Sequence, residues 1–251
     1  MDEIRWHRFD SIESTNTFLR LNGGDGADCA YEVAVAAFQT AGHGQQGNGW
    51  ESESGRNLLF SILTHPVAVS AGRQFLISQA IALAVSDCVM DCLGPDLGRH
   101  VSVKWPNDIY WKDFKMAGIL IENSLAGSRI SDSIIGVGLD VNQTVFLSDA
   151  PNPVSMANIA GHEFELEPLL SAVVDRFRDY MALTDSEGGR LQIDRKYHSR
   201  LFRRDGWHRF CDAGGVFEAR ILGVEPVGCL VLETRDGQHR TYEFKQVRFV
   251  L

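Results

Sequence analysis

Short strand-like runs dominate the hydrophobic pattern up to about residue 141. A short apolar or β-branched run bounded by turn residues predicts a strand. Such runs occupy residues 4–9, 31–39, 58–64, 101–105, 108–111, 116–122 and 133–141. The later runs follow one another through tight turns, such as the turn at residues 111–113, which is typical of antiparallel hairpins. The pattern therefore predicts a mainly antiparallel sheet.

Helix-like stretches lie between and after these strands. Residues 73–93 are apolar almost all round, which predicts a buried helix that ends at a Gly-Pro pair. Residues 168–183 and 190–202 are predicted as two later helices, and the sheet would pack on the helices at residues 73–93 and 168–183. Near the N-terminus, Ser14 suits a helix cap, because its hydroxyl can accept a hydrogen bond from a free backbone N–H group.

The pattern changes after about Trp207. Further strands are predicted at residues 216–222, 230–233 and 241–244, with glycine-containing turns between them. Four or five short strands without a helix are typical of a small β-barrel that forms its own unit. We place the boundary near residues 203–206, so the predicted domains are residues 1–204 and 205–251.

Composition narrows the class of protein. The 251 residues are 44% hydrophobic and 23% charged, which is ordinary for a soluble globular chain. No apolar run approaches membrane-spanning length and the first ten residues hold no signal region, so we expect a cytoplasmic protein without membrane contact. The net charge of -9 argues against general nucleic-acid binding. It leaves open an anionic small molecule, because local charge decides that.

The five cysteines are scattered, which suits a reducing compartment better than a disulfide framework. Cys88 and Cys92 are four residues apart on a predicted helix and could face a metal ion together. No further His or Cys lies near them in the sequence. We therefore favour two small buried residues over a metal site.

A glycine-rich loop follows the second predicted strand. It reads QTAGHGQQGNGW from Gln39 to Trp50. Glycines let backbone N–H groups approach a ligand closely, and successive N–H groups form nests that bind anions. Trp50 could stack on a nucleobase. The loop matches neither a P-loop nor a dinucleotide fingerprint, so a plain surface loop stays the alternative.

Charged residues interrupt the next predicted hairpin. The stretch VSVKWPNDIYWKDFKMAGILIEN places Lys104, Asp108 and Lys115 close to an apolar Ile-Leu-Ile run. Buried charges are costly without partners, so these residues need either water or a charged ligand.

Four stretches together resemble the biotin protein ligases. They are SIESTN, QTAGHGQQGNGW, KWPNDIYWKDFKMAGILIE and IIGVGLDVN, in the order that the family has them. The tail from Phe217 to Val250 also resembles the small C-terminal domain of that family. The resemblance implies an α+β fold with a mixed, mainly antiparallel sheet packed with helices, similar to class II aminoacyl-tRNA synthetases and biotinyl/lipoyl ligases. An SH3-like β-barrel would follow it.

The resemblance also implies a two-step reaction. Biotin would be activated by ATP as biotinyl-5'-AMP and transferred to a lysine of a biotin carboxyl carrier domain, such as that of acetyl-CoA carboxylase. The chain starts at the first catalytic strand, so we expect a monofunctional ligase without a DNA-binding domain. A homodimer through an exposed sheet edge is a further possibility.

Site residues follow from the resemblance, position by position. Biotin contacts are expected at Ser14, Thr15, Asn16, Gln39, His43, Gly44, Gln45, Lys115 and Gly118. Adenylate contacts are expected at Trp50, Asn107, Asp108 and Asp140. Asp108 would also help to hold Mg²⁺. Lys115 is the expected catalytic residue, because its ammonium would lie between the biotin carboxylate and the α-phosphate.

Two departures from the family pattern stand out. The loop commonly carries arginines where this chain has His43, Gln45 and Asn48, and Asp140 stands where asparagine is common. We therefore expect weaker retention of the adenylate, or a stronger dependence on Mg²⁺ and pH. A lipoate or octanoate ligase of related fold and a noncatalytic biotin-binding module are the alternatives.

Overall fold

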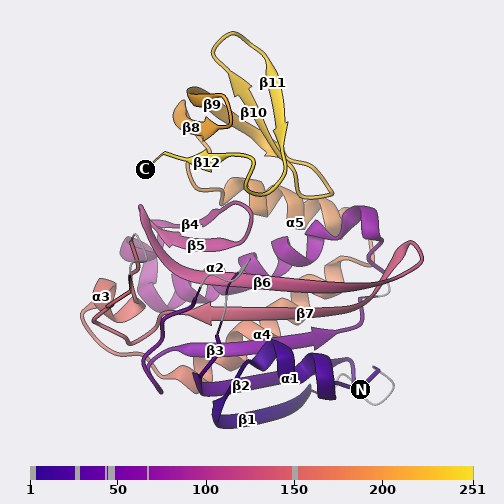
Figure 1. Cartoon of the computed structure of the whole chain (residues 1–251), viewed down its shortest axis with the longest axis vertical. Coiled ribbons are helices and arrows are strands. Elements are labelled where there is room, and N and C mark those ends of the chain that lie inside the picture. Colours follow the sequence, from indigo (N-terminus) through magenta and orange to yellow (C-terminus); the bar gives the residue numbers. More distant parts are fainter. Residues whose placement is uncertain are drawn as a thin grey trace.

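A computed structural model of the chain describes residues 4–25, 29–42, 44, 49–66, 68–148 and 152–250. Seven strands form the larger sheet, in the order β1-β2-β3-β7-β6-β5-β4 (Figure 1). Their bounds are β1 (Ile4–Ile12), β2 (Tyr31–Gln39), β3 (Leu58–Thr64), β4 (Val101–Lys104), β5 (Asp108–Trp111), β6 (Phe114–Ala126) and β7 (Arg129–Leu139). Each predicted strand of this region is confirmed, with shifts of a few residues at the ends of β1, β4, β6 and β7.

The strand pairing is mixed but mainly antiparallel, as predicted. β1 and β2 are parallel and are joined by the helix α1 (Thr15–Asn22). The other neighbours in this sheet pair antiparallel. Because β1 and β2 are parallel, their C-terminal ends lie side by side, with Ile12 opposite Gln39. The start of α1, which follows β1, therefore lies next to the end of β2.

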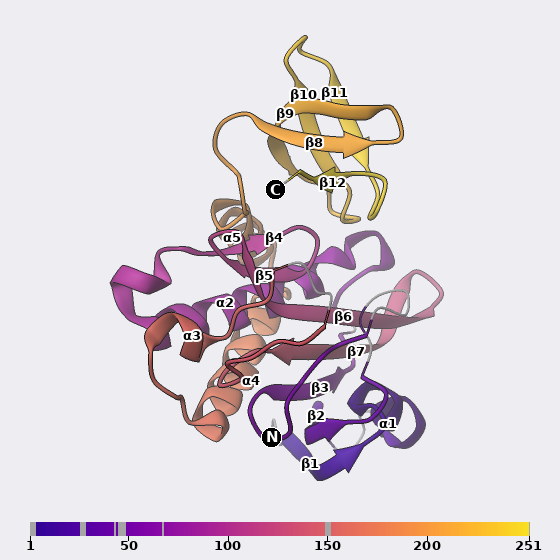
Figure 2. The same cartoon turned by 60° about the vertical axis from the view of Figure 1, so that its left-hand side comes forward.

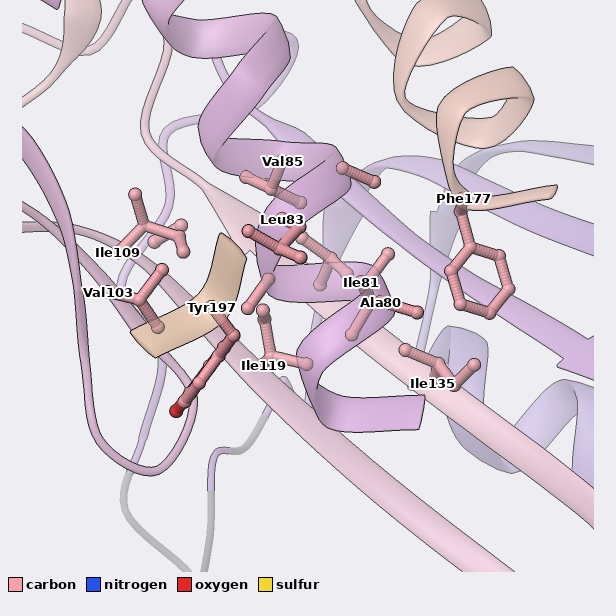
Figure 3. Close-up of a cluster of buried hydrophobic side chains, with 14 of the residues drawn as sticks. Ala80, Ile81, Leu83, Val85, Val103, Ile109, Ile119, Ile135, Phe177 and Tyr197 are labelled. Carbon is pink, nitrogen blue, oxygen red and sulfur yellow. The ribbon is translucent and has the colours of Figure 1, made fainter. Parts of the chain in front are cut away.

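Helices cover both faces of the larger sheet. α1 lies on one face, while α2 (Phe75–Gly98) and α4 (Leu166–Leu183) lie on the other (Figures 1 and 2). The short helices η2 (Ala71–Arg73) and α3 (Met156–Ala160) and the helix α5 (Glu187–Ser199) complete the helical elements of the described chain. Figure 3 shows Ile81, Leu83 and Val85 of α2 packed among side chains of the strands, α4 and α5.

The helix α2 corrects the expectation that no apolar run approaches membrane-spanning length. The stretch Ala71–Gly98 is long and apolar enough to cross a membrane by those two criteria, but 78% of its most apolar window is buried inside the protein. It therefore has the surroundings of a core helix. The helix breaks at Gly94 as predicted, with φ 73°, and a further turn beginning with Pro95 follows the break.

The C-terminal strands form a second sheet, in the order β11-β10-β9-β8-β12. Their bounds are β8 (His208–Asp212), β9 (Gly215–Val224), β10 (Leu230–Thr234), β11 (His239–Tyr242) and β12 (Arg248–Phe249). All neighbours are antiparallel, but no pairing joins the outer strands β11 and β12 within the described residues. The closed SH3-like barrel is thus not confirmed, and the domain boundary stays a prediction.

The second sheet contacts the turn between β4 and β5 and the helix α5 through hydrogen bonds. The Trp105 indole N–H donates to the Gly228 carbonyl at 2.8 Å, and the Val224 N–H donates to His198 Nε2 at 2.8 Å. Figures 1 and 2 show this sheet above β4, β5 and α5. The contacts place its last strand at the rim of the site described next.

Candidate active site

A cavity of about 400 Å³ opens on the face of the larger sheet opposite α2. Its floor is made by Gly118 of β6 and by Gly136 and Gly138 of β7. Alternate residues of a strand face opposite sides, so Ile135 packs in the core while these glycines face the cavity. Three strand positions without side chains let Trp50 and Asn16 approach the backbone of the sheet closely.

The indole of Trp50 lies across this glycine floor. A Cβ on Gly138 would come within 2.5 Å of Trp50 Cε2, and one on Gly118 within 3.0 Å of Trp50 Cζ3. Gly118 and Gly138 are direct cross-strand partners, so together they form a flat bed for the ring. The indole nitrogen of Trp50 is buried and has no hydrogen-bond partner among the described residues. The ring therefore has an unused donor within the site.

One end of the cavity is polar and uncharged. Ser14, Thr15 and Asn16 line it from the start of α1, and Gln39 lines it from the end of β2. Ser14 is the predicted cap of α1, and its hydroxyl accepts from the Thr17 N–H at 3.4 Å. The Thr15 N–H donates to Gln39 Oε1 at 2.7 Å. The parallel pair of β1 and β2 thus brings Gln39 next to the consecutive residues Ser14, Thr15 and Asn16.

The other end is charged. Lys115 Nζ lies 2.8 Å from Asp108 Oδ1, with the lysine side chain 34% and the aspartate side chain 26% exposed. Both residues line the cavity, as does Asn107, whose side-chain amide donates to the Ile119 carbonyl. The ammonium also lies 5.8 Å from the Trp50 ring centroid. The structure therefore brings together the predicted adenylate and catalytic residues of this hairpin.

A β-bulge aims Lys115 into the cavity. The register between β5 and β6 shifts, so that Ile109 pairs with Ala117 but Tyr110 pairs with Lys115. Met116 is the extra residue and is fully buried in the core. Without the bulge, strict alternation from Gly118 would point Met116 at the cavity and Lys115 at the core.

The sequence profile of the biotin/lipoate A/B protein ligase family matches residues 8–140. The chain belongs to this family. The matched range contains both ends of the cavity, and the predicted resemblance to biotin protein ligases is confirmed.

Individual ligases of this family align over most of the chain. The bifunctional ligase/repressor BirA of Bacillus subtilis is 28% identical over 220 residues, covering 84% of this chain and 64% of that protein. The biotin–[acetyl-CoA-carboxylase] ligase of Paracoccus denitrificans is 26% identical over 216 residues, covering 81% of this chain and 85% of that protein. The chain thus spans 64% of the length of the first relative.

A solved structure supports the same fold. The biotin protein ligase of Aquifex aeolicus in complex with biotin and ATP superposes with a TM-score of 0.78, covering 100% of both chains at 22% identity. At this identity the likeness shows a shared fold.

Asp140, a predicted adenylate contact, is buried. It follows β7 with 3% of its surface exposed and does not line the cavity. Burial holds the pKa of its carboxyl well above the ordinary value, although the nearby Lys115 lowers it in part. One carboxyl oxygen has no hydrogen-bond partner among the described residues. The adenylate contact of Asp140 therefore stays a prediction.

Lys104 has a partner other than Asp108. Its ammonium donates to the Tyr110 hydroxyl at 2.9 Å and lies 4.6 Å from the Tyr110 ring centroid. Burial lowers its pKa, which the charge of Asp108 opposes. Lys104 lines the cavity, but Lys115 forms the ion pair with Asp108.

The C-terminal sheet supplies lining residues that the sequence did not reveal. They are Phe244, Lys245, Val247, Arg248 and Phe249. Nothing in their local pattern marks a site, because only the packing of the two sheets brings them to the rim. In the glycine loop, Gly44 lines the cavity, while the predicted contacts His43 and Gln45 lie outside the described residues.

The part of the chain that the structure describes holds no cluster of three or more metal-ligating side chains of the His, Cys, Asp or Glu type. Cys88 is buried, and desolvation raises the pKa of its thiol to about 12. A metal ligand would be the thiolate, so this environment disfavours metal binding there. The expectation of two buried residues is confirmed for Cys88 but is wrong for Cys92, which is exposed.

Proposed function

We propose that the chain is an ATP-dependent biotin protein ligase that forms biotinyl-5'-AMP and then biotinylates a lysine of an acceptor protein. The observation that carries the proposal is the Lys115–Asp108 pair, 2.8 Å apart in the same cavity as the polar end formed by Ser14, Thr15, Asn16 and Gln39. A neutral ring with donors and acceptors suits the polar end, and anionic groups suit the ammonium. The Aquifex relative was solved with biotin and ATP. Biotin has a neutral ring that suits the polar end, and its carboxylate and the phosphates of ATP suit the charged end.

In the first step, a carboxylate oxygen of biotin attacks the α-phosphorus of ATP. A P–O bond forms to biotin, and the bond to the β-phosphate oxygen breaks to release pyrophosphate. The Lys115 ammonium would lie between the two anions, offsetting their repulsion and stabilising the charge that develops at the α-phosphate. Asp108 would hold the ammonium in place through their ion pair.

In the second step, the neutral amine of an acceptor lysine attacks the carbonyl carbon of the mixed anhydride. The new C–N bond forms as the bond to the phosphate oxygen breaks, AMP leaves and the amine loses a proton. The adenylate must be kept from water between the two steps. The Trp50 ring on its glycine bed and the rim from the C-terminal sheet would provide this cover.

Mg²⁺ fits the charged end as a phosphate-bound ion. Mg²⁺ uses one or two carboxylates together with substrate phosphates, and Asp108 is the partly exposed carboxylate of the cavity lining. When bound, the ion would neutralise charge on the leaving pyrophosphate. Asp108 would help to hold the ion and would keep its ion pair with Lys115.

Further features of the proposal rest on the enzyme class. The acceptor would be a biotin carboxyl carrier domain of a carboxylase; the name of the Paracoccus relative gives acetyl-CoA carboxylase as the acceptor of that protein. For the C-terminal sheet we retain the SH3-like barrel as a proposal, supported by its five antiparallel strands. The monofunctional character, the cytoplasmic location, the absence of nucleic-acid binding and a homodimer stay predictions.

The test is release of pyrophosphate from ATP and Mg²⁺ in the presence of biotin or of lipoate, followed by transfer to a carrier domain. We expect biotin to start the release and lipoate to leave it at background. Release with lipoate alone would favour the lipoate ligase alternative, which the family also includes. Biotin binding without pyrophosphate release would favour the noncatalytic module.

A further inference from the structure

A buried hydroxyl lies directly behind the polar end of the cavity. Ser61 of β3 is 0% exposed and is not part of the cavity lining. Its Oγ lies 2.6 Å from Thr15 Oγ1 and donates to Asn16 Oδ1 at 2.5 Å. Ser61 therefore connects two residues that do line the cavity.

The available hydrogens fix the direction of these bonds. Thr15 and Ser61 each have one hydroxyl hydrogen. Ser61 uses its hydrogen for Asn16 Oδ1, so Thr15 must donate to Ser61 for their 2.6 Å contact to be a hydrogen bond. The Thr15 hydroxyl also lies 3.1 Å from Gln39 Oε1, but its one hydrogen goes to the shorter contact with Ser61, and Gln39 Oε1 accepts from the Thr15 N–H at 2.7 Å. The lone pairs of the Thr15 hydroxyl then stay available as acceptors.

Glu122 of β6 fixes the other side of the Asn16 amide. Asn16 Nδ2 donates to Glu122 Oε2 at 2.9 Å, and Arg20 donates to Glu122 Oε1 at 2.9 Å. A flipped amide would set its oxygen against the carboxylate, which is unfavourable. The amide also lies against the backbone of Gly136, where a Cβ would come within 2.4 Å of Asn16 Oδ1.

We propose that Ser61 and Glu122 are positioning residues that set the donor and acceptor pattern of the polar end. With Asn16 locked between them, the cavity offers the Thr15 hydroxyl as an acceptor and the remaining N–H of Asn16 as a donor. Gln39 adds its amide N–H groups, because its oxygen is occupied by Thr15. A cyclic urea, which has N–H donors beside a carbonyl acceptor, complements this pattern. The inference rests on the proposed function, because biotin carries that group.

Ser61→Ala removes the hydroxyl that connects Thr15 and Asn16, and Ser133→Ala is its matched control. Ser133 is also 0% exposed and lies on β7 of the same sheet, but its hydroxyl has no hydrogen-bond partner among the described residues. We expect Ser61→Ala to raise the KM for biotin about tenfold, with the KM for ATP and kcat changed less than about twofold. Ser133→Ala should leave all three constants within about twofold of wild type.

Substitutions of Glu122 provide a second test. The Glu122 side chain is partly exposed, so changing it disturbs the folded core less than changing Ser61. Glu122→Ala removes the acceptor for Asn16, so we expect the KM for biotin to rise about threefold. Glu122→Gln keeps a carbonyl oxygen that can accept the same hydrogen bond, so its KM should return close to the wild-type value. A merely structural role would not separate the KM for biotin from that for ATP.

The outcomes distinguish this inference from the proposed function. An active wild type whose KM for biotin is unchanged by Ser61→Ala and Glu122→Ala overturns the inference alone. The same holds if both variants raise the KM for ATP as much as that for biotin. A wild type that neither releases pyrophosphate with biotin nor shows a biotin-induced rise in melting temperature overturns the proposed function, and the inference with it.

Discussion

The two ends of the cavity are held in different ways. At the polar end, Thr15 and Asn16 are 2% and 4% exposed and are tied to buried neighbours by hydrogen bonds. At the charged end, the Lys115 and Asp108 side chains are 34% and 26% exposed and are tied mainly to each other. The contrast suggests that the protein alone sets the geometry of the polar end, whereas the ligands complete the charged end.

This division predicts different kinetic signatures for the two ends. Changes at a preformed binding end should affect the KM for biotin, as with the Ser61 and Glu122 variants. Changes where charge develops during reaction should affect kcat. Three further variants are given from the largest expected effect to the smallest. The first two test the two functions of the cavity, and the third tests the stability of the buried region beside it.

Lys115→Ala should have the largest effect. Loss of the ammonium removes the charge that stabilises the reacting phosphate, so we expect kcat for biotin-dependent pyrophosphate release to fall at least about a hundredfold. The matched control is Lys112→Ala, because Lys112 is an exposed lysine in the same hairpin whose ammonium lies over the Trp111 ring. Equal rates for the two variants would remove the charged end from the mechanism.

Gly138→Ala should have an intermediate effect. The new Cβ would come within 2.5 Å of Trp50 Cε2, so the ring must leave its position on the floor. We expect the KM for ATP to rise about tenfold if Trp50 covers the adenine, with a smaller change in the KM for biotin. Gly188→Ala on α5 is the control, because a Cβ there would have no atom within 4 Å. An unchanged KM for ATP would show that the ring is not part of the nucleotide site.

Asp140→Asn should have the smallest effect, and it concerns stability. The folded state favours the neutral acid because burial raises its pKa, while the unfolded chain ionises above the ordinary value of 3.8. Ionisation of the unfolded state therefore lowers the stability of the wild type as pH rises through this range. The asparagine variant lacks this loss, so we expect it to gain about 1 kcal/mol at pH 8 and almost nothing near pH 4.

Urea unfolding of both proteins at the two pH values measures this difference. An equal gain at pH 4 and pH 8 would show that the ionisation of Asp140 is not its cause. A loss at pH 8 would show that the carboxylate has a partner in the folded protein.

Local patterns in the sequence predicted much of the fold. The bounds of β2, β3 and β5 agree with the predicted runs, and the Ser14 cap is confirmed. These features depend on neighbouring residues, which the sequence displays directly. The helix α3 and the strands β8 and β12 were missed, because five-residue and two-residue elements with little apolar periodicity have weak local signals.

The site was only partly predictable for the same physical reason. Lys115 and Asp108 could be named from their motif, but their orientation depends on the bulge at Met116, which appears only in the strand register. Ser61 was missed because it is a single small polar residue within a buried apolar strand and contacts Asn16 only after folding. The burial of Asp140 was also not predicted, because the strand and the helix that cover it meet only after folding.

A structure of the complex with biotin and a non-hydrolysable ATP analogue tests the division of the cavity most directly. We predict that the ureido ring of biotin hydrogen-bonds to Thr15 and Gln39 and that its carboxylate lies within 3.5 Å of Lys115 Nζ, as a direct hydrogen bond requires. Biotin bound in the reverse orientation, or bound outside this cavity, would contradict the account.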